Sequence, residues 1–280
     1  MKSLSCWVRS GVLAKVLAWM AMGCPPSALP ADDHPGLRIV WENEMLTVRG
    51  AELAGGEVKI HYLEAFCRDG STDRDWDATV IKHRTQLLTA DPAGSALKLR
   101  NTLDDGVVVD HDIQAGRDEV SFKVVAANPT PIASRAHWAQ PCIRVDRFTG
   151  RAQADYVERC FVVLDGTVVP LPTQPWATTA RYTPGQVYCP PGVDRRDVNP
   201  RPLSTLVPSR GLIGCFSADG RQILATAWEP YQELFQGVIV CIHSDFRIGG
   251  LEPGEQKRIR GKLYLVTEPI GKLMARYERD

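Results

Sequence analysis

The sequence predicts an all-β fold, a large antiparallel β-sandwich with a long, ordered proline-rich loop and a short C-terminal helix. Three observations support this prediction. Apolar and polar residues alternate with a period of two along several segments, Asp-Gly pairs separate apolar runs, and strands do not alternate with helices. The 280 residues, 44% of them apolar, are enough for one large domain.

Period-two alternation marks three segments, 57–67, 120–126 and 259–265, as half-buried strands. In the first segment the alternation breaks at Glu64. The second ends at Asn128-Pro129, because proline cannot donate a hydrogen bond to a sheet ladder.

Asp-Gly pairs between apolar runs are typical of hairpin turns, and we expect turns at 105–106, 165–166 and 219–220. The helix that the pattern supports runs from Gly271 to Glu278 near the C-terminus. Leu273, Met274 and Tyr277 share one face of it.

Residues 1–31 have the layout of a secretory signal peptide, with Lys2 and Arg9 before an apolar stretch and small residues up to Ala31. The apolar stretch is shorter than the ~20 residues needed to span a bilayer, so we expect no membrane span. A lipid anchor at Cys24 is the alternative to free release. The sequence therefore predicts a secreted or periplasmic protein whose residues 32–280 form a single β-sandwich domain.

The charges argue against a nucleic-acid partner, because Lys plus Arg and Asp plus Glu number 33 each and form no basic stripe. Six cysteines remain after removal of the leader, and export permits disulfides among them. Their apolar surroundings favour a role as small buried side chains. Without a Cys-x-x-Cys pair, the sequence has neither a zinc ribbon nor a thioredoxin-type motif. A metal shared by His243, Asp245 and His137 finds no support in their spacing, so we expect neither a metal site nor a cofactor.

Nine of the twenty prolines lie between Pro170 and Pro208. Such a stretch predicts a long surface loop rather than strands. Trp176, Tyr182 and Tyr188 favour an ordered loop that lies over the sheet, because large aromatic side chains tend to be buried. Whether it closes a cleft or only covers a sheet face stays open.

Two segments carry a family resemblance: the strand 120–129, which ends in Asn-Pro, and Leu251-Glu252-Pro253-Gly254-Glu255 before a basic strand. They resemble parts of the galactose-mutarotase-like β-supersandwich of carbohydrate-active proteins. The mature chain as a whole also resembles uncharacterised secreted bacterial proteins. The resemblance implies a supersandwich-like fold and a carbohydrate partner.

The segment 137–144 combines an imidazole, an indole, an amide and a guanidinium. If it is a strand, Trp138, Gln140 and Arg144 share one face and His137 lies on the other. An apolar platform with fork-shaped donors is typical of a site for a sugar or a carboxylate. The alternative is that Trp138 belongs to the core.

A second candidate is Glu229 between Trp228 and Tyr231, where apolar neighbours would make it a general acid or base. A third is His243 with Asp245 and Arg247 on one strand face. In both cases the alternative is an ordinary surface ion pair. Asp110-His111-Asp112 is expected at an exposed turn.

Two functions remain open. In the first, this is a secreted carbohydrate-active protein that binds or processes a sugar or uronate on a concave sheet face by lyase or epimerase chemistry. Its catalytic residues would be His243, Glu229 and His137. The substrate would be held by a set of aromatic, amide and charged residues: Trp138, Gln140, Arg144, Trp228, Tyr231, Asp245 and Arg247. In the second, it is a non-catalytic exported domain that binds carbohydrate or an envelope partner.

Overall fold

The structure is a computed structural model that describes residues 36–172, 186–199, 203–237 and 239–280. All of these belong to one compact unit, His34–Asp280. The unit is all-β, as the sequence predicts, and antiparallel strands pair throughout its two sheets. Within the described ranges no helix is long and apolar enough to cross a membrane. The expected leader and the lipid-anchor position Cys24 lie outside the described residues.

The seven-stranded sheet has the order β1-β2-β3-β9-β15-β14, with β4 beside β3. Its strands are β1 (Arg38–Glu42), β2 (Met45–Arg49), β3 (Glu57–Arg68), β4 (Val80–Ile81), β9 (Ala136–Arg144), β14 (Tyr231–Gln236) and β15 (Cys241–Arg247).

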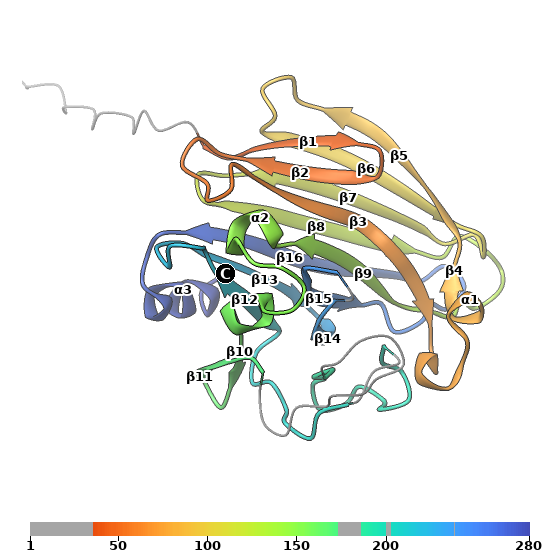
Figure 1. Cartoon of the computed structure of the whole chain (residues 1–280). Helices are drawn as coiled ribbons and strands as arrows, with labels where there is room; N and C mark the ends of the chain where they lie inside the picture. The colour runs from red at the N-terminus through yellow and green to blue at the C-terminus, as the bar shows by residue number, and fades with distance from the viewer. Residues whose placement is uncertain (1–35, 173–185, 200–202, 238) are drawn as a thin grey trace, which may run out of the picture. The chain divides into compact units, whose positions relative to one another are not determined.

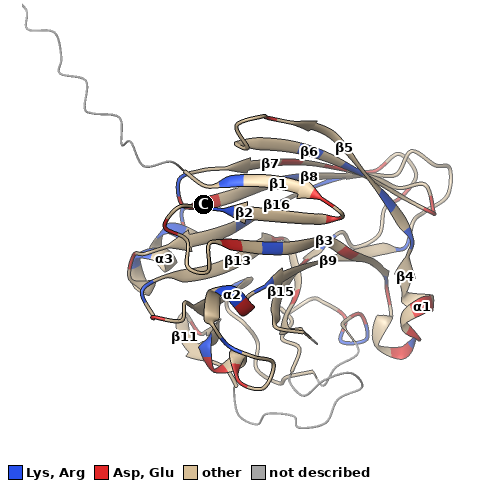
Figure 2. Cartoon of the chain, turned by 45° about the horizontal axis from the view of Figure 1, so that its top comes forward, with Lys and Arg blue, Asp and Glu red and all other residues tan. Residues whose placement is uncertain are grey.

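The nine-stranded sheet has the order β11-β10-β12-β13-β16-β8-β7-β6-β5. Its strands are β5 (His83–Ala90), β6 (Ala96–Leu103), β7 (Val108–Ala115), β8 (Glu119–Ala127), β10 (Cys160–Leu164), β11 (Thr167–Pro170), β12 (Leu212–Phe216), β13 (Ile223–Glu229) and β16 (Gln256–Val266). The two sheets pack face to face (Figure 1). Lys, Arg, Asp and Glu are scattered over the strands of both (Figure 2).

Aromatic side chains fill the core between the sheets. Tyr62 of β3 stacks on Phe122 of β8 with ring centroids 5.4 Å apart, and Trp228 of β13 packs on Phe246 of β15 at 4.8 Å. Gly261 makes room for the indole, because a Cβ at 261 would lie 2.4 Å from a Trp228 ring carbon. Trp228 is only 3% exposed. It is therefore a core residue and not a platform for a sugar, a correction to the sequence-based assignment.

The expected Asp-Gly turns are present. Asp165 and Gly166 join β10 to β11 with φ values of 47° and 71°, the left-handed pair that a two-residue hairpin needs. Gly106, between β6 and β7, and Gly220, between β12 and β13, have φ values of 89° and 72°. The remaining short helical segments lie in connections: 3-10 turns at Ser71–Asp73 and Tyr156–Arg159, α1 (Trp76–Thr79) and α2 (Asp146–Thr149).

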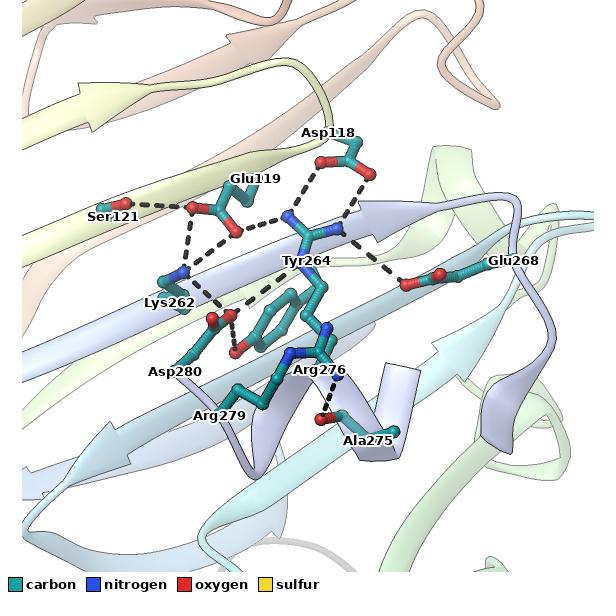
Figure 3. A network of polar contacts seen from close by, with 10 residues as sticks. All are labelled: Asp118, Glu119, Ser121, Lys262, Tyr264, Glu268, Ala275, Arg276, Arg279 and Asp280. Carbon is teal, nitrogen blue, oxygen red and sulfur yellow. Dashed lines mark hydrogen bonds and ion pairs between the residues drawn. The ribbon is translucent and has the colours of Figure 1, made fainter. Parts of the chain in front are cut away.

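The predicted C-terminal helix is α3 (Ile270–Tyr277), which covers part of the outer face of the nine-stranded sheet. Leu273 is fully buried there. Arg276 donates to both carboxylate oxygens of Asp118 (2.8 and 2.9 Å) and to Glu119, and so ties the helix to the start of β8 (Figure 3). These hydrogen bonds belong to one network, which also includes Lys262 and Asp280.

Part of the proline-rich segment, residues 186–199, begins beside the edge strand β14 and continues over the outer face of the seven-stranded sheet. Tyr188 exchanges backbone hydrogen bonds with Leu234 (2.9 and 2.8 Å) and is fully buried. Val187, Val193 and Val198 pack with Phe235 in a small separate core. These residues are ordered and cover the sheet, as the sequence predicts. Trp176 and Tyr182 lie outside the described residues.

Candidate functional site

Polar side chains gather on the outer face of β9, β14 and β15, beneath residues 186–199. The strands contribute Gln140, Gln232, Glu233, His243 and Asp245, each at most 5% exposed. The covering segment adds Gln186, Asp197 and Asn199, which are also buried. Burial of so many polar groups costs free energy unless partners compensate for it, so a concentration of this kind is typical of a functional site.

The part of this layer that reaches solvent is a cluster of His137, Asp197 and Arg247. His137 Nδ1 lies 2.9 Å from Asp197 Oδ2, and Arg247 Nη1 lies 3.4 Å from the same oxygen. The side chains of His137 and Arg247 are 23% and 26% exposed, whereas that of Asp197 is 4% exposed. The imidazole and the guanidinium therefore form a rim, and the carboxylate lies beneath them.

A β-bulge in β9 brings His137 into this cluster. Cys67 of β3 pairs with Trp138, but Arg68 pairs with Ala136, so His137 is an extra residue on its strand. Bulges redirect side chains from the regular alternation. The expectation that His137 lies on the face opposite Gln140 is therefore wrong, because the local register is not regular.

The backbone around Asp197 is held by contacts at both ends. Its own N–H donates to the carbonyl of Asp194 (2.8 Å), and the N–H of Asn199 donates to both carboxylate oxygens of Glu233 (3.1 and 2.8 Å). The carbonyl of Val198 accepts from Ser71 Oγ and Thr72 Oγ1, both at 3.0 Å. These contacts fix the Asp197 carboxylate beneath the imidazole.

Gln232 supports Arg247 from β14. Its amide oxygen accepts from Arg247 Nη1 at 2.5 Å, and its amide nitrogen donates to the backbone carbonyl of Asp197. Asp197 Oδ1 and Gln140 Oε1 are buried and accept no hydrogen bond from the residues that the structure describes. Buried acceptors without a partner are uncommon in folded proteins and are often found at functional sites.

This geometry suits proton transfer. A carboxylate at Nδ1 holds an imidazole in one orientation and leaves Nε2 to take or give a proton. Nε2 of His137 lies toward Gly250, where an added Cβ would come within 3.3 Å of it. Lys257 Nζ donates to the carbonyl of Gly250 (2.6 Å), so a second cation lies near the rim.

A second group of titratable residues lies deeper along β15. Cys241 Sγ is 3.4 Å from His243 Nε2, and His243 Nδ1 is 3.4 Å from Asp245 Oδ1. Burial alone would lower the pKa of His243, but Cys241 and Asp245 outweigh burial and raise it. A hydrogen bond from Cys142, together with His243, lowers the pKa of Cys241. All four residues are at most 1% exposed.

The expected pair of His243 and Glu229 is not assembled. Glu229 is exposed at the end of β13, on the face of the nine-stranded sheet that carries α3. It lines a groove of about 400 Å³ together with Arg260 and Tyr277. His243 lies on the outer face of the other sheet, buried against Phe235. The aromatic core separates them, which is the physical reason that they do not act on one substrate.

Of the other residues expected to bind substrate, some lie in the polar layer and the rest lie elsewhere in the fold. Arg247 and Asp245 lie in the polar layer with Gln140. Trp138 is fully buried against Trp76 and Cys67, as the core alternative has it. Arg144 lies at the opposite end of β9, beside Lys59 and Asp146. Tyr231 is half-buried, and its hydroxyl donates to the carbonyl of Pro208 (3.4 Å).

Sequence reasoning missed five members of the polar layer: Gln186, Asp197, Asn199, Gln232 and Glu233. Asp197 lies in Arg195-Arg196-Asp197, within the proline-rich stretch, and no local pattern connects it with His137. An acidic residue in a loop that is expected to cover the sheet was the available signal.

No protein-family model matches the chain, and no curated protein matches it by sequence. Similar solved structures include a putative aldose 1-epimerase from Escherichia coli K12, with 9% identity and a TM-score of 0.43 over 83% of this chain and 99% of that one. A galactose mutarotase-like protein from Lactobacillus casei has 9% identity and a TM-score of 0.42 over 82% and 100%. The Slr1438 protein of Synechocystis sp. PCC 6803 has 10% identity and a TM-score of 0.45 over 84% and 97%.

The resemblance to galactose-mutarotase-like sandwiches that the sequence predicts is thus also found among solved structures. Identities of 9–10% and TM-scores below 0.5 say nothing about the reaction or the ligand.

Proposed function

We propose that this protein is an exported carbohydrate-active enzyme that removes a proton from an acidic sugar, as in lyase or epimerase chemistry. The observation that carries the proposal is the His137–Asp197 contact of 2.9 Å beside Arg247 at a solvent-accessible rim. Export rests on the leader pattern of residues 1–31.

His137 Nε2 is the proton acceptor in this proposal. Asp197 holds the ring through Nδ1 and stabilises the imidazolium that forms. The proton comes from the carbon beside the sugar carboxylate, and the electron pair of the broken C–H bond moves into that carboxylate. Return of a proton to the opposite face would give an epimer, and expulsion of the substituent on the next carbon would give an unsaturated sugar.

Arg247 is the group that favours an acidic sugar over a neutral one. A guanidinium binds a carboxylate through two parallel hydrogen bonds and compensates the negative charge that grows as the proton leaves. Lys257 adds a further positive charge nearby. A neutral aldose has no carboxylate for these cations to bind.

The test is a ligand and turnover panel of neutral aldoses, uronic acids and uronate oligosaccharides on the purified chain. A ligand at a hundredfold its Kd should raise the melting temperature by roughly 5–10 °C. We expect that rise with uronates, together with epimerised or unsaturated product. Binding without product would favour the non-catalytic carbohydrate-binding alternative, and no binding to any sugar would overturn both.

A further inference from the structure

Three metal-ligand atoms converge at the buried end of β9 and β15, away from the His137 rim. The Sγ atoms of Cys142 and Cys241 and an imidazole nitrogen of His243 lie within 4.8 Å of one another. The three residues are each 1% exposed. The site proposed above uses none of them.

We propose that Cys142, Cys241 and His243 bind one Zn²⁺ ion. Cysteine sulfur and imidazole nitrogen are donors that Zn²⁺ favours. Tetrahedral Zn²⁺, with bonds of about 2.3 Å to sulfur and 2.0 Å to nitrogen, holds such donors roughly 3.5 Å apart. The distance from Cys241 Sγ to His243 Nε2 is 3.4 Å, so these two donors need almost no rearrangement.

Asp245 places a carboxylate beside the ring nitrogen of His243 that does not face the proposed metal ion. Metal-binding histidines commonly direct the second ring nitrogen to a carboxylate, which fixes the ring and its tautomer. His243 Nδ1 lies 3.4 Å from Asp245 Oδ1, so Nε2 is the atom directed at Cys241. The ring of Phe235 stacks on His243 at 4.3 Å and holds its plane.

Gly237 lets the backbone come close to the donor atoms of Cys241 and His243. A Cβ at this position would lie 1.9 Å from Cys241 Sγ and 3.2 Å from His243 Nε2, so only glycine fits. The Tyr156 hydroxyl donates to the carbonyls of Gly237 and Cys241, both at 3.1 Å, and closes the same turn. The backbone is thus drawn close around the three donor atoms.

The strand register argues against a disulfide between Cys142 and Cys241. Ile242 pairs with Ile143 and Phe246 with Ala139, so Cys142 lies opposite His243 and diagonal to Cys241. Diagonal residues of an antiparallel pair have Cα atoms about 7–8 Å apart, more than the ~6.8 Å that a disulfide tolerates. A metal ion bridges this longer separation. Cys160 and Cys215, by contrast, are directly opposite each other.

The test is the metal content of the full chain, purified without chelator and after incubation with Zn²⁺. We expect about one Zn²⁺ per chain, and loss of that ion in Cys142→Ser and Cys241→Ser. Cys215→Ala, which removes a buried thiol outside the cluster, is the matched control and should keep the ion. No bound ion, or equal loss in the control, would overturn the proposal.

Co²⁺ substitution of the wild-type chain tests the same site without any variant that could fail to fold. We expect intense near-ultraviolet charge transfer from thiolate to Co²⁺ and visible bands of a tetrahedral ion. Absence of the charge-transfer absorption would overturn the proposal. So would mass spectrometry of the unreduced protein that finds Cys142 and Cys241 joined.

Discussion

Nδ1 of His137 lies 2.9 Å from Oδ2 of Asp197, a residue 60 positions later in the chain. One partner comes from a bulged strand and the other from the proline-rich segment that covers the sheet. The contact joins these two parts of the molecule at the position where Arg247 reaches the surface. It is the basis of the predictions for activity.

Replacement of Asp197 by Asn should lower kcat by at least about 10²-fold, because the imidazole loses its orienting carboxylate while the volume is kept. Steady-state kinetics on the uronate that the panel identifies measures this change. Glu229→Gln is the control, since Glu229 lies on the other sheet, and it should leave kcat unchanged. Equal losses in both variants would contradict the assignment.

Replacement of Arg247 by Gln should act mainly on substrate affinity. Loss of a charged hydrogen bond to a carboxylate costs about 1.5–3 kcal/mol, so KM should rise by roughly 10- to 150-fold. Arg247→Lys should recover part of this loss, because it restores the charge but not the paired donors. An unchanged KM in Arg247→Gln would show that the carboxylate binds elsewhere.

His111 should make the fold sensitive to acid. Burial lowers its pKa to about 3, whereas in the unfolded chain it titrates near its usual value of about 6.5. The unfolded state therefore binds the extra proton between these two values. The contribution of neutral His111 is complete above pH 6.5 and declines as the pH falls, by about 1.4 kcal/mol per unit.

Urea unfolding at pH 7 and pH 4.5 tests this prediction, with His111→Gln as the comparison. Nδ1 of His111 lies 2.9 Å from the Tyr62 hydroxyl, a contact that the Gln amide is able to replace. The wild type should lose roughly 2–3 kcal/mol more than the variant over this interval. If the wild type and the variant lose the same free energy of unfolding, His111 is not the source of the acid sensitivity.

Leu273→Ala should destabilise the protein by about 2–5 kcal/mol, because its side chain fills the contact between α3 and the nine-stranded sheet. Lys272→Ala, one residue earlier and exposed, should change the free energy of unfolding by no more than about 0.5 kcal/mol. Denaturant titration of both variants makes the comparison. A small effect of Leu273→Ala would mean that the helix adds little to the fold.

The sheets and their turns were predictable from sequence because the signals are local. Alternation identified β8 and β16, and the Asp165-Gly166 pair identified the turn between β10 and β11. The same reasoning failed at polar residues inside regular strands. His111 was expected at an exposed turn, but it lies within β7 and is 2% exposed.

The site was only partly predictable. His137, Arg247 and Gln140 were identified from their residue types, but their partner Asp197 depends on a long-range return of the chain. Trp228 shows a second limit, because an aromatic residue of the core and one that stacks on a sugar look alike in sequence. The face of the sheet on which the residue lies decides between them. Glu229 and His243 are separated because their strands belong to different sheets.

Deuterium exchange tests whether His137 takes the proton. The wild-type chain in D₂O should place deuterium on the carbon beside the carboxylate of a bound uronate, followed by NMR, and His137→Ala should abolish this exchange while Glu229→Gln retains it. Exchange by His137→Ala at the wild-type rate would contradict the assignment of His137 as the base.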